Sequence, residues 1–100
     1  MKKFELNEKE LEQVAGGKNS EYYAVQVMAL DSAVIVTAKA SITDLKILYN
    51  DGKREMILKH VPCMSVGEEA SAVFGYNYDK ASFFISCIAD GVEQYYNVEF

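Results

Sequence analysis

Beyond Glu21, apolar and polar residues alternate in short runs that are rich in β-branched and aromatic side chains. A period of two is typical of strands with one buried face. Turns are predicted at Asp31-Ser32, at residues 50–53 and at Asp90-Gly91, where the Asp-Gly pair suits the positive φ values of a type I′ hairpin. The predicted strands are residues 22–30, 33–40, 42–50, 54–60, 70–76, 82–89 and 92–100.

The alternation also predicts which side chains face a core, because every second residue of a strand points to the same side. Short antiparallel strands with one apolar face indicate a small all-β sandwich, of an immunoglobulin-like or fibronectin-like arrangement. A β-barrel is the alternative. The side chains predicted to be buried are Val34, Val36, Ala38, Leu45, Ile47, Tyr49, Phe83, Ile85, Cys87, Tyr96, Val98 and Phe100.

The first residues of the chain follow a different, helical pattern. Asn7 is suited to the N-cap and Glu10 falls at N3, the spacing of a capping box. Leu6 and Leu11 occupy the two positions of a hydrophobic staple. We therefore expect a short amphipathic helix that begins at Asn7 and ends at the glycine pair 16–17.

This segment resembles the double-glycine leader peptides of bacteriocins and related exported precursors. The resemblance covers residues 1–17 only, and it rests on Leu6, Asn7, Glu10, Leu11, Val14, Gly16 and Gly17. It implies that a peptidase-containing ABC transporter recognises the leader and cuts the Gly17–Lys18 bond. By the same resemblance, Leu6, Leu11 and Val14 dock on the peptidase and Glu10 makes a polar contact. Glycines have no side chain and can thread a channel too narrow for a Cβ atom.

A second interpretation of the same residues remains open. An amphipathic helix that ends at a Gly-Gly C-cap can pack on the domain through Phe4, Leu11 and Val14 without being cleaved. In that case the chain is a non-catalytic binding domain with a permanent N-terminal helix.

Charge and apolar run lengths narrow the range of partners. The formal net charge is -5, and no basic stripe is present, so the sequence does not predict nucleic-acid binding. No apolar run approaches the roughly 20 residues of a membrane-spanning helix. A general secretory signal needs a basic start followed by an apolar run, whereas residues 4–12 are rich in Glu. The predicted domains are a leader, residues 1–17, and a secreted domain, residues 18–100, which reaches the outside through the transporter.

The two cysteines, Cys63 and Cys87, allow two predictions. An exported protein meets conditions in which a disulfide persists, and such a bond would close a loop worth roughly 3 to 4 kcal/mol in a chain-entropy model. Alternatively, both are free thiols, since cysteine is among the residues most often buried.

Candidate chemistry elsewhere is sparse. His60 and Cys63 invite comparison with a base and a nucleophile, but Pro62 between them predicts a loop and no third group completes a site. Metal binding is not predicted, since structural zinc sites use four ligands with close paired spacing. We therefore predict a protein that is not an enzyme and has no cofactor. The mature domain is either bacteriocin-like or a binding protein for an extracellular protein or glycan.

Tyrosines occur in adjacent pairs, such as residues 22–23 and 95–96. In a strand, one ring of each pair points to the core and the other points outward. The outward rings are candidates for a recognition patch, although cross-strand packing is the simpler interpretation.

Overall fold

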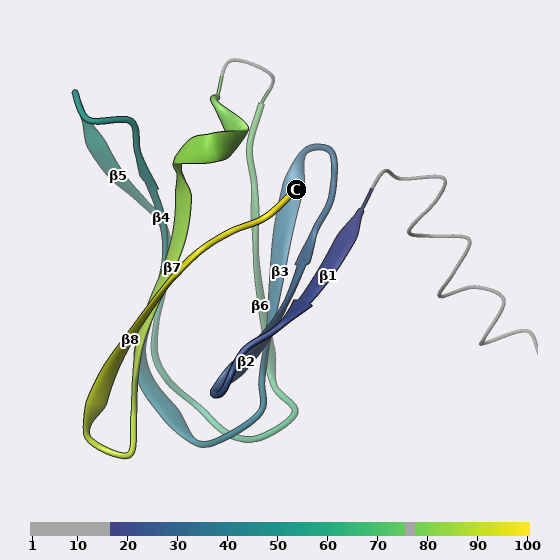
Figure 1. Ribbon diagram of the computed structural model, residues 1–100. Coiled ribbons are helices and arrows are strands. Elements are labelled where there is room, and N and C mark those ends of the chain that lie inside the picture. Colours follow the sequence, from purple (N-terminus) through teal and green to yellow (C-terminus); the bar gives the residue numbers. More distant parts are fainter. Residues whose placement is uncertain (1–16, 76–77) are drawn as a thin grey trace, which may run out of the picture.

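The computed structural model describes residues 17–75 and 78–100, which form eight strands and one short 3-10 helix (Figure 1). The strands are β1 (Lys18–Glu21), β2 (Val25–Ala29), β3 (Ala33–Ala38), β4 (Ile42–Asn50), β5 (Glu55–Met64), β6 (Glu69–Val73), β7 (Phe83–Ala89) and β8 (Val92–Asn97). The 3-10 helix, η1, spans Lys80–Ser82, and the Asp79 side chain caps it by accepting a hydrogen bond from the Ala81 N–H.

The strands form two four-stranded antiparallel sheets that face each other (Figure 1). Sheet 1 has the order β1-β2-β3-β6, and sheet 2 has the order β5-β4-β7-β8. The all-β prediction with antiparallel sheets is confirmed. The alternative of a closed barrel is wrong for the described residues, because no strand pairing joins the two sheets at either side.

The core lies between the two sheets and follows the alternation of the strands. Residues at every second position of β2, β3 and β7 are buried, as expected when one face of each strand packs on the opposite sheet. The predicted inward faces of β3, β4 and β7 are confirmed, and Tyr96 and Phe100 are half-buried against the core. The largest fully buried side chains are Phe83, Ile42, Leu45, Ile47, Ile85, Val25, Val27, Val34, Val36 and Cys87.

After β8 the chain crosses from sheet 2 toward sheet 1 (Figure 1). The Val98 N–H donates to the Phe83 carbonyl oxygen over 2.9 Å. The Phe100 ring packs edge-on against Phe74 and at an angle to Phe83, with centroid distances of 5.9 and 5.6 Å. The C-terminal segment therefore covers one end of the core.

Several predicted boundaries differ from the structure. No strand is predicted before residue 22, but Lys18–Glu21 form β1. Residues 60–63 were expected to form a loop around Pro62, but they continue β5. Pro62 is tolerated because β5 is an edge strand, where a missing N–H need not break a ladder bond. The predicted helix from Asn7 lies outside the described residues.

Candidate functional site

Gly17 lies directly before β1 and packs against the end of β2. A Cβ atom built on Gly17 would lie 2.8 Å from Leu30 Cδ2 and 3.2 Å from the Ala29 carbonyl oxygen. Ordinary carbon contacts lie near 3.5–4.0 Å, so a side chain here requires Leu30 to move. Glycine is therefore favoured at position 17 by the fold itself, independently of any peptidase.

Lys18 is the first residue of β1 and is tied to two parts of the molecule. In the ladder it lies opposite Ala29 of β2. Its Nζ lies 3.2 Å from Glu99 Oε1 in the C-terminal segment. We call Gly17, Lys18 and the residues that contact them the junction. The two sides of the predicted cut are thus held by β2 on one flank and by the C-terminal segment on the other.

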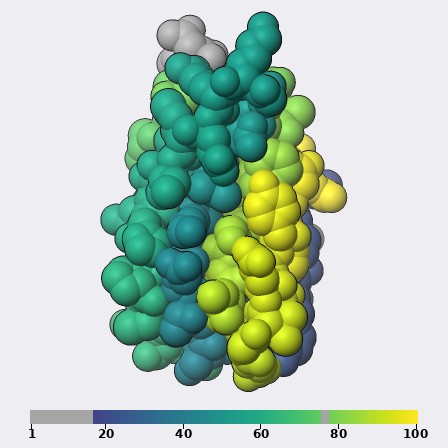
Figure 2. All heavy atoms as spheres, turned by 90° about the vertical axis from the view of Figure 1, so that its left-hand side faces the viewer, coloured from purple at the N-terminus to yellow at the C-terminus, as the bar shows by residue number. Residues whose placement is uncertain are grey.

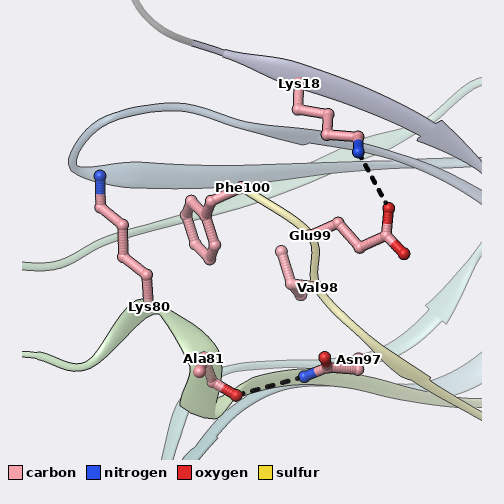
Figure 3. Close-up of a pocket in the computed structure, with 7 residues that line it drawn as sticks. All are labelled: Lys18, Lys80, Ala81, Asn97, Val98, Glu99 and Phe100. Atoms are coloured by element: carbon pink, nitrogen blue, oxygen red, sulfur yellow. Dashed lines mark hydrogen bonds and ion pairs between the residues drawn. The ribbon is translucent and has the colours of Figure 1, made fainter.

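Next to the junction is an open depression of about 530 Å³ (Figure 3). It lies between β1, η1 and the C-terminal segment, and its residues are Lys18, Lys80, Ala81, Asn97, Val98, Glu99 and Phe100. The Phe100 ring lies between the two lysine side chains, and Lys80 Nζ is 5.5 Å from its centroid.

The charges around the depression balance each other. Lys18 pairs with Glu99, and Lys80 Nζ lies 2.8 Å from Asp31 Oδ1. All four side chains are largely exposed, so each pair contributes little to stability, typically 0–1 kcal/mol. The depression therefore offers two neutralised ion pairs around an aromatic ring, rather than a site selective for anions.

The remaining leader residues singled out in the sequence, namely Leu6, Glu10, Leu11, Val14 and Gly16, lie outside the described residues. Of the predicted cleavage site, the structure places Gly17 and Lys18, which are adjacent in the chain and both contact the end of β2.

The predicted disulfide between Cys63 and Cys87 is absent, and both thiols are free. Cys63 is exposed on β5 and Cys87 is buried on β7. Strand β4 lies between β5 and β7, so the two cysteines are separated by about two strand spacings, roughly 9–10 Å. This exceeds the Cα separation of about 7 Å that a disulfide can bridge. Burial raises the pKa of the Cys87 thiol.

Sequence reasoning missed a polar pair on the outer side of sheet 2. His60 Nε2 lies 2.7 Å from Asp44 Oδ1, and this hydrogen bond lowers the pKa of the Asp44 carboxyl. Asp44 has a φ of 55° at an irregularity in the pairing of β4 with β7. The signal available in the sequence was that Asp44 and Leu45 break the strict alternation of β4, as happens at a bulge, which can turn a side chain outward.

The outer face of sheet 2 is turned toward the viewer in Figure 2, and apolar side chains from neighbouring strands lie on it. Ile57, Leu48 and Phe84 are opposite one another on β5, β4 and β7. The Tyr95 ring on β8 stacks on Phe84 with a centroid distance of 5.2 Å and a 20° interplanar angle. Ile57 and Tyr95 remain more than half exposed, so this row, the outer row, is a candidate interaction surface.

The tyrosine pairs divide as predicted. Tyr23 and Tyr95 are exposed, whereas Tyr22 and Tyr96 are half-buried and stack on each other at 4.2 Å. Tyr23 donates a hydrogen bond to Asp90 Oδ2, which raises the pKa of its hydroxyl. The stacked Tyr22 and Tyr96 rings therefore connect the end of β1 in sheet 1 with β8 in sheet 2.

Within residues 17–75 and 78–100, no helix combines the length and the apolar character that crossing a membrane requires. The same ranges contain no cluster of three or more His, Cys, Asp or Glu side chains suited to a metal ion.

Comparison of the chain with protein-family models, with curated proteins and with solved structures finds no match in any of the three.

Proposed function

We propose that the chain is the precursor of a small exported protein. Residues 1–17 act as a double-glycine leader that a peptidase-containing ABC transporter recognises and removes after Gly17. One observation supports this most directly: β1 starts at Lys18, so every strand of the sandwich lies on the C-terminal side of the proposed cut. Cleavage there would release the domain with all eight strands intact.

The chemistry of the leader supports the same assignment. Leu6, Leu11 and Val14 would provide an apolar strip for a groove on the peptidase, and helix-in-groove docking uses such spacing. Glu10 would add a polar contact. Two consecutive glycines allow a peptidase to close around the backbone on both sides of the chain.

For the mature domain we infer a fibronectin-like or immunoglobulin-like arrangement. In those sandwiches, strands B and E pair in one sheet while C and F pair in the other. Here β3 pairs with β6 and β4 pairs with β7, with β8 as the hairpin partner of β7. Strand β1 is additional to this arrangement, because it extends sheet 1 beyond β2.

We further propose that the mature domain is a secreted binding protein whose partner is an extracellular protein or glycan. The outer row supports this role, because an exposed tyrosine stacked on Phe84 offers a flat aromatic face of the kind enriched in binding surfaces. A bacteriocin-like killing role is the other candidate. The formal charge of residues 18–100, which contain seven Lys and Arg and eleven Asp and Glu, is -4 and weakens this candidate, since anionic lipid surfaces repel an acidic domain.

The intact mass of the extracellular protein tests the export proposal. We expect a product that starts at Lys18 from the wild type, and retained full-length chain from Gly17→Val. Gly75→Val is the matched control, because a Cβ at Gly75 meets no atom within 4 Å. Leu11→Asp is a second variant, and it changes no residue of the eight strands. Normal release of a Lys18 product from both Gly17→Val and Leu11→Asp would overturn the proposal.

The proposal can also be distinguished from the uncleaved-helix alternative and from killing activity. An extracellular protein that retains residues 1–17 would favour the alternative. Purified residues 18–100 added to indicator bacteria should leave growth unchanged while binding a cell surface or a partner. Growth inhibition would favour the bacteriocin-like role.

A further inference from the structure

We propose that folding protects the Gly17–Lys18 bond, so that the leader is removed before β1 docks on β2. The identity of the enzyme rests on the proposed function, whereas the protection follows from the packing of β1. A chain that folds before it meets the peptidase would keep its leader.

The pairing of β1 is the first reason. All four residues that follow the bond are in register with β2, from Lys18 opposite Ala29 to Glu21 opposite Gln26. Strand β1 is the edge of sheet 1, so β2 occupies one of its two backbone edges. A peptidase that pairs with an extended substrate, as in strand addition, can reach only the other edge while β2 stays in place. A cleft that encloses the substrate on both sides must therefore displace β2.

The second reason is the lack of space beside Gly17. A methyl group on this residue would already come within 2.8 Å of Leu30 Cδ2. A peptidase channel that closes around Gly17 would have to displace the Leu30 side chain and separate Gly17 from the Ala29 carbonyl oxygen. Because Gly17 has no side chain, it suits a narrow peptidase channel. In the folded state the same absence lets Gly17 pack against the end of β2.

The third reason is that the far end of β1 is anchored. The Tyr22 N–H donates to the Val25 carbonyl oxygen, and the Tyr22 hydroxyl donates to the Asn97 carbonyl oxygen over 3.2 Å. The Tyr22 ring stacks on Tyr96, and Lys39 Nζ donates to the Tyr22 carbonyl oxygen. These contacts hold β1 from the end opposite to the bond.

Folding kinetics provide time for cleavage. Sandwiches are dominated by contacts between residues distant in sequence and fold in milliseconds to seconds. In β3 and β6, for example, Thr37 lies opposite Glu69. Strands β1 and β2 form a local hairpin, but an isolated two-stranded hairpin is only marginally stable in water. Lasting protection of the bond therefore begins only when the rest of the sandwich has folded.

A peptidase that cuts on the amino side of lysine tests the protection, because it requires neither the leader nor the second glycine. In the folded full chain we expect cutting at Gly17–Lys18 to be at least tenfold slower than in the chain unfolded with urea. The same dipeptide, Gly52–Lys53, lies in the exposed β4–β5 turn and provides an internal reference. Cleavage is followed by the mass of the fragment that starts at each lysine.

Ser20→Pro, in the middle of β1, removes a backbone N–H and leaves Gly17 and Lys18 unchanged. We expect it to raise cutting at Gly17–Lys18 at least tenfold relative to Gly52–Lys53, while Ser20→Ala behaves as the wild type. If Ser20→Pro is cut faster at both Gly17–Lys18 and Gly52–Lys53, the whole domain has unfolded. Hydrogen exchange of the wild-type amides 18–21 then decides the matter, with slow exchange supporting the proposal and unprotected exchange refuting it.

Equal cutting of folded and unfolded wild type would overturn the proposal, as would a Ser20→Pro domain that stays folded and is cut no faster. A second assay uses the isolated peptidase domain of the transporter on folded and on unfolded chain. It distinguishes failure of the protection from failure of the proposed function. Failure to cut either form would refute the function and leave the protection standing, whereas equal cutting of both forms would support the function and refute the protection.

Discussion

At the scale of single residues, Asp44 combines an uncommon backbone conformation with a specific side-chain contact. Its φ of 55° is in the left-handed region, which costs most L-residues energy but which Asp and Asn tolerate. The conformation lets the carboxylate reach His60 Nε2 at 2.7 Å, with Lys46 Nζ at 3.8 Å. A local bulge has thus placed three charged or polar groups together on the outside of sheet 2.

Asp44→Asn isolates the charge, because Asn also accepts the left-handed conformation. The folded state lowers the pKa of Asp44 below 3.8, mainly through the hydrogen bond from His60. A carboxyl with a lowered pKa stabilises the fold above its unfolded pKa, and that contribution disappears as pH falls through the folded value. We expect the wild type to have the higher Tm at pH 7. The difference should shrink as pH falls below 3.8 and vanish below the folded pKa of Asp44. A difference that stays constant across this range would contradict the assignment.

The two cysteines should differ in reactivity. Cys63 is exposed, whereas Cys87 is 1% exposed and burial raises the pKa of its thiol. Because the thiolate is the reactive species, we expect one alkylated thiol in the folded protein, located at Cys63, and two after denaturation. Cys63→Ser should show none in the folded state. A protein that takes up no reagent until a reductant is added would contain the disulfide that the structure excludes.

At the scale of elements, the tight turn between β7 and β8 is the feature the sequence predicted most specifically. Asp90 and Gly91 have φ values of 54° and 75°, as a type I′ turn requires. The prediction is confirmed because the Asp-Gly pair determines the turn locally, without help from the rest of the fold.

Gly91→Ala should therefore destabilise the domain, and Gly75→Ala should not. Neither added Cβ would meet an atom within 4 Å, but only Gly91 has a positive φ. A left-handed conformation costs a residue with a side chain roughly 1–2 kcal/mol, which urea unfolding measures directly. Equal stability of the two variants would show that the turn relaxes without cost.

Other elements could not be predicted from local pattern. Strand β1 has the sequence Lys-Asn-Ser-Glu, which lacks both alternation and β propensity, so its conformation comes from pairing with β2. The continuation of β5 through Pro62 depends on β5 being an edge. The choice between a disulfide and two free thiols was left open for the same reason, because only the sheet order places β4 between the two cysteines. In contrast, β2 to β8 follow from alternation, since each has one face in the core.

At the scale of the whole molecule, the end of the proposed leader, Gly17, lies directly before the first strand of the sandwich. Of residues 1–17, the structure describes Gly17, whose contact is with Leu30 and Ala29. The glycine pair itself was visible in the sequence. Its position against β2 was not, because this depends on β1 forming at all.

Two truncations test this boundary. Residues 18–100 should have a Tm within a few degrees of the full chain, because all the strands remain. Residues 22–100 should have a Tm several degrees below that of residues 18–100, because β1 and its ladder to β2 are lost. In a domain of this size, a loss of about 1 kcal/mol lowers the Tm by roughly 4–8 °C. A large loss on removing residues 1–17 alone would instead indicate that the N-terminal segment packs on the domain.

The anchoring of Phe100 limits where a label can be attached. Its ring fills the end of the core against Phe74 and Phe83, so a fluorophore or affinity tag joined there would pull on the core. If residues 1–17 are removed as proposed, a tag ahead of Lys18 is lost with them. The hairpin tip at Gly52 and Lys53 is exposed, and the φ of 90° at Gly52 requires the glycine to be kept. A reporter inserted after Lys53 would therefore stay with the proposed mature domain.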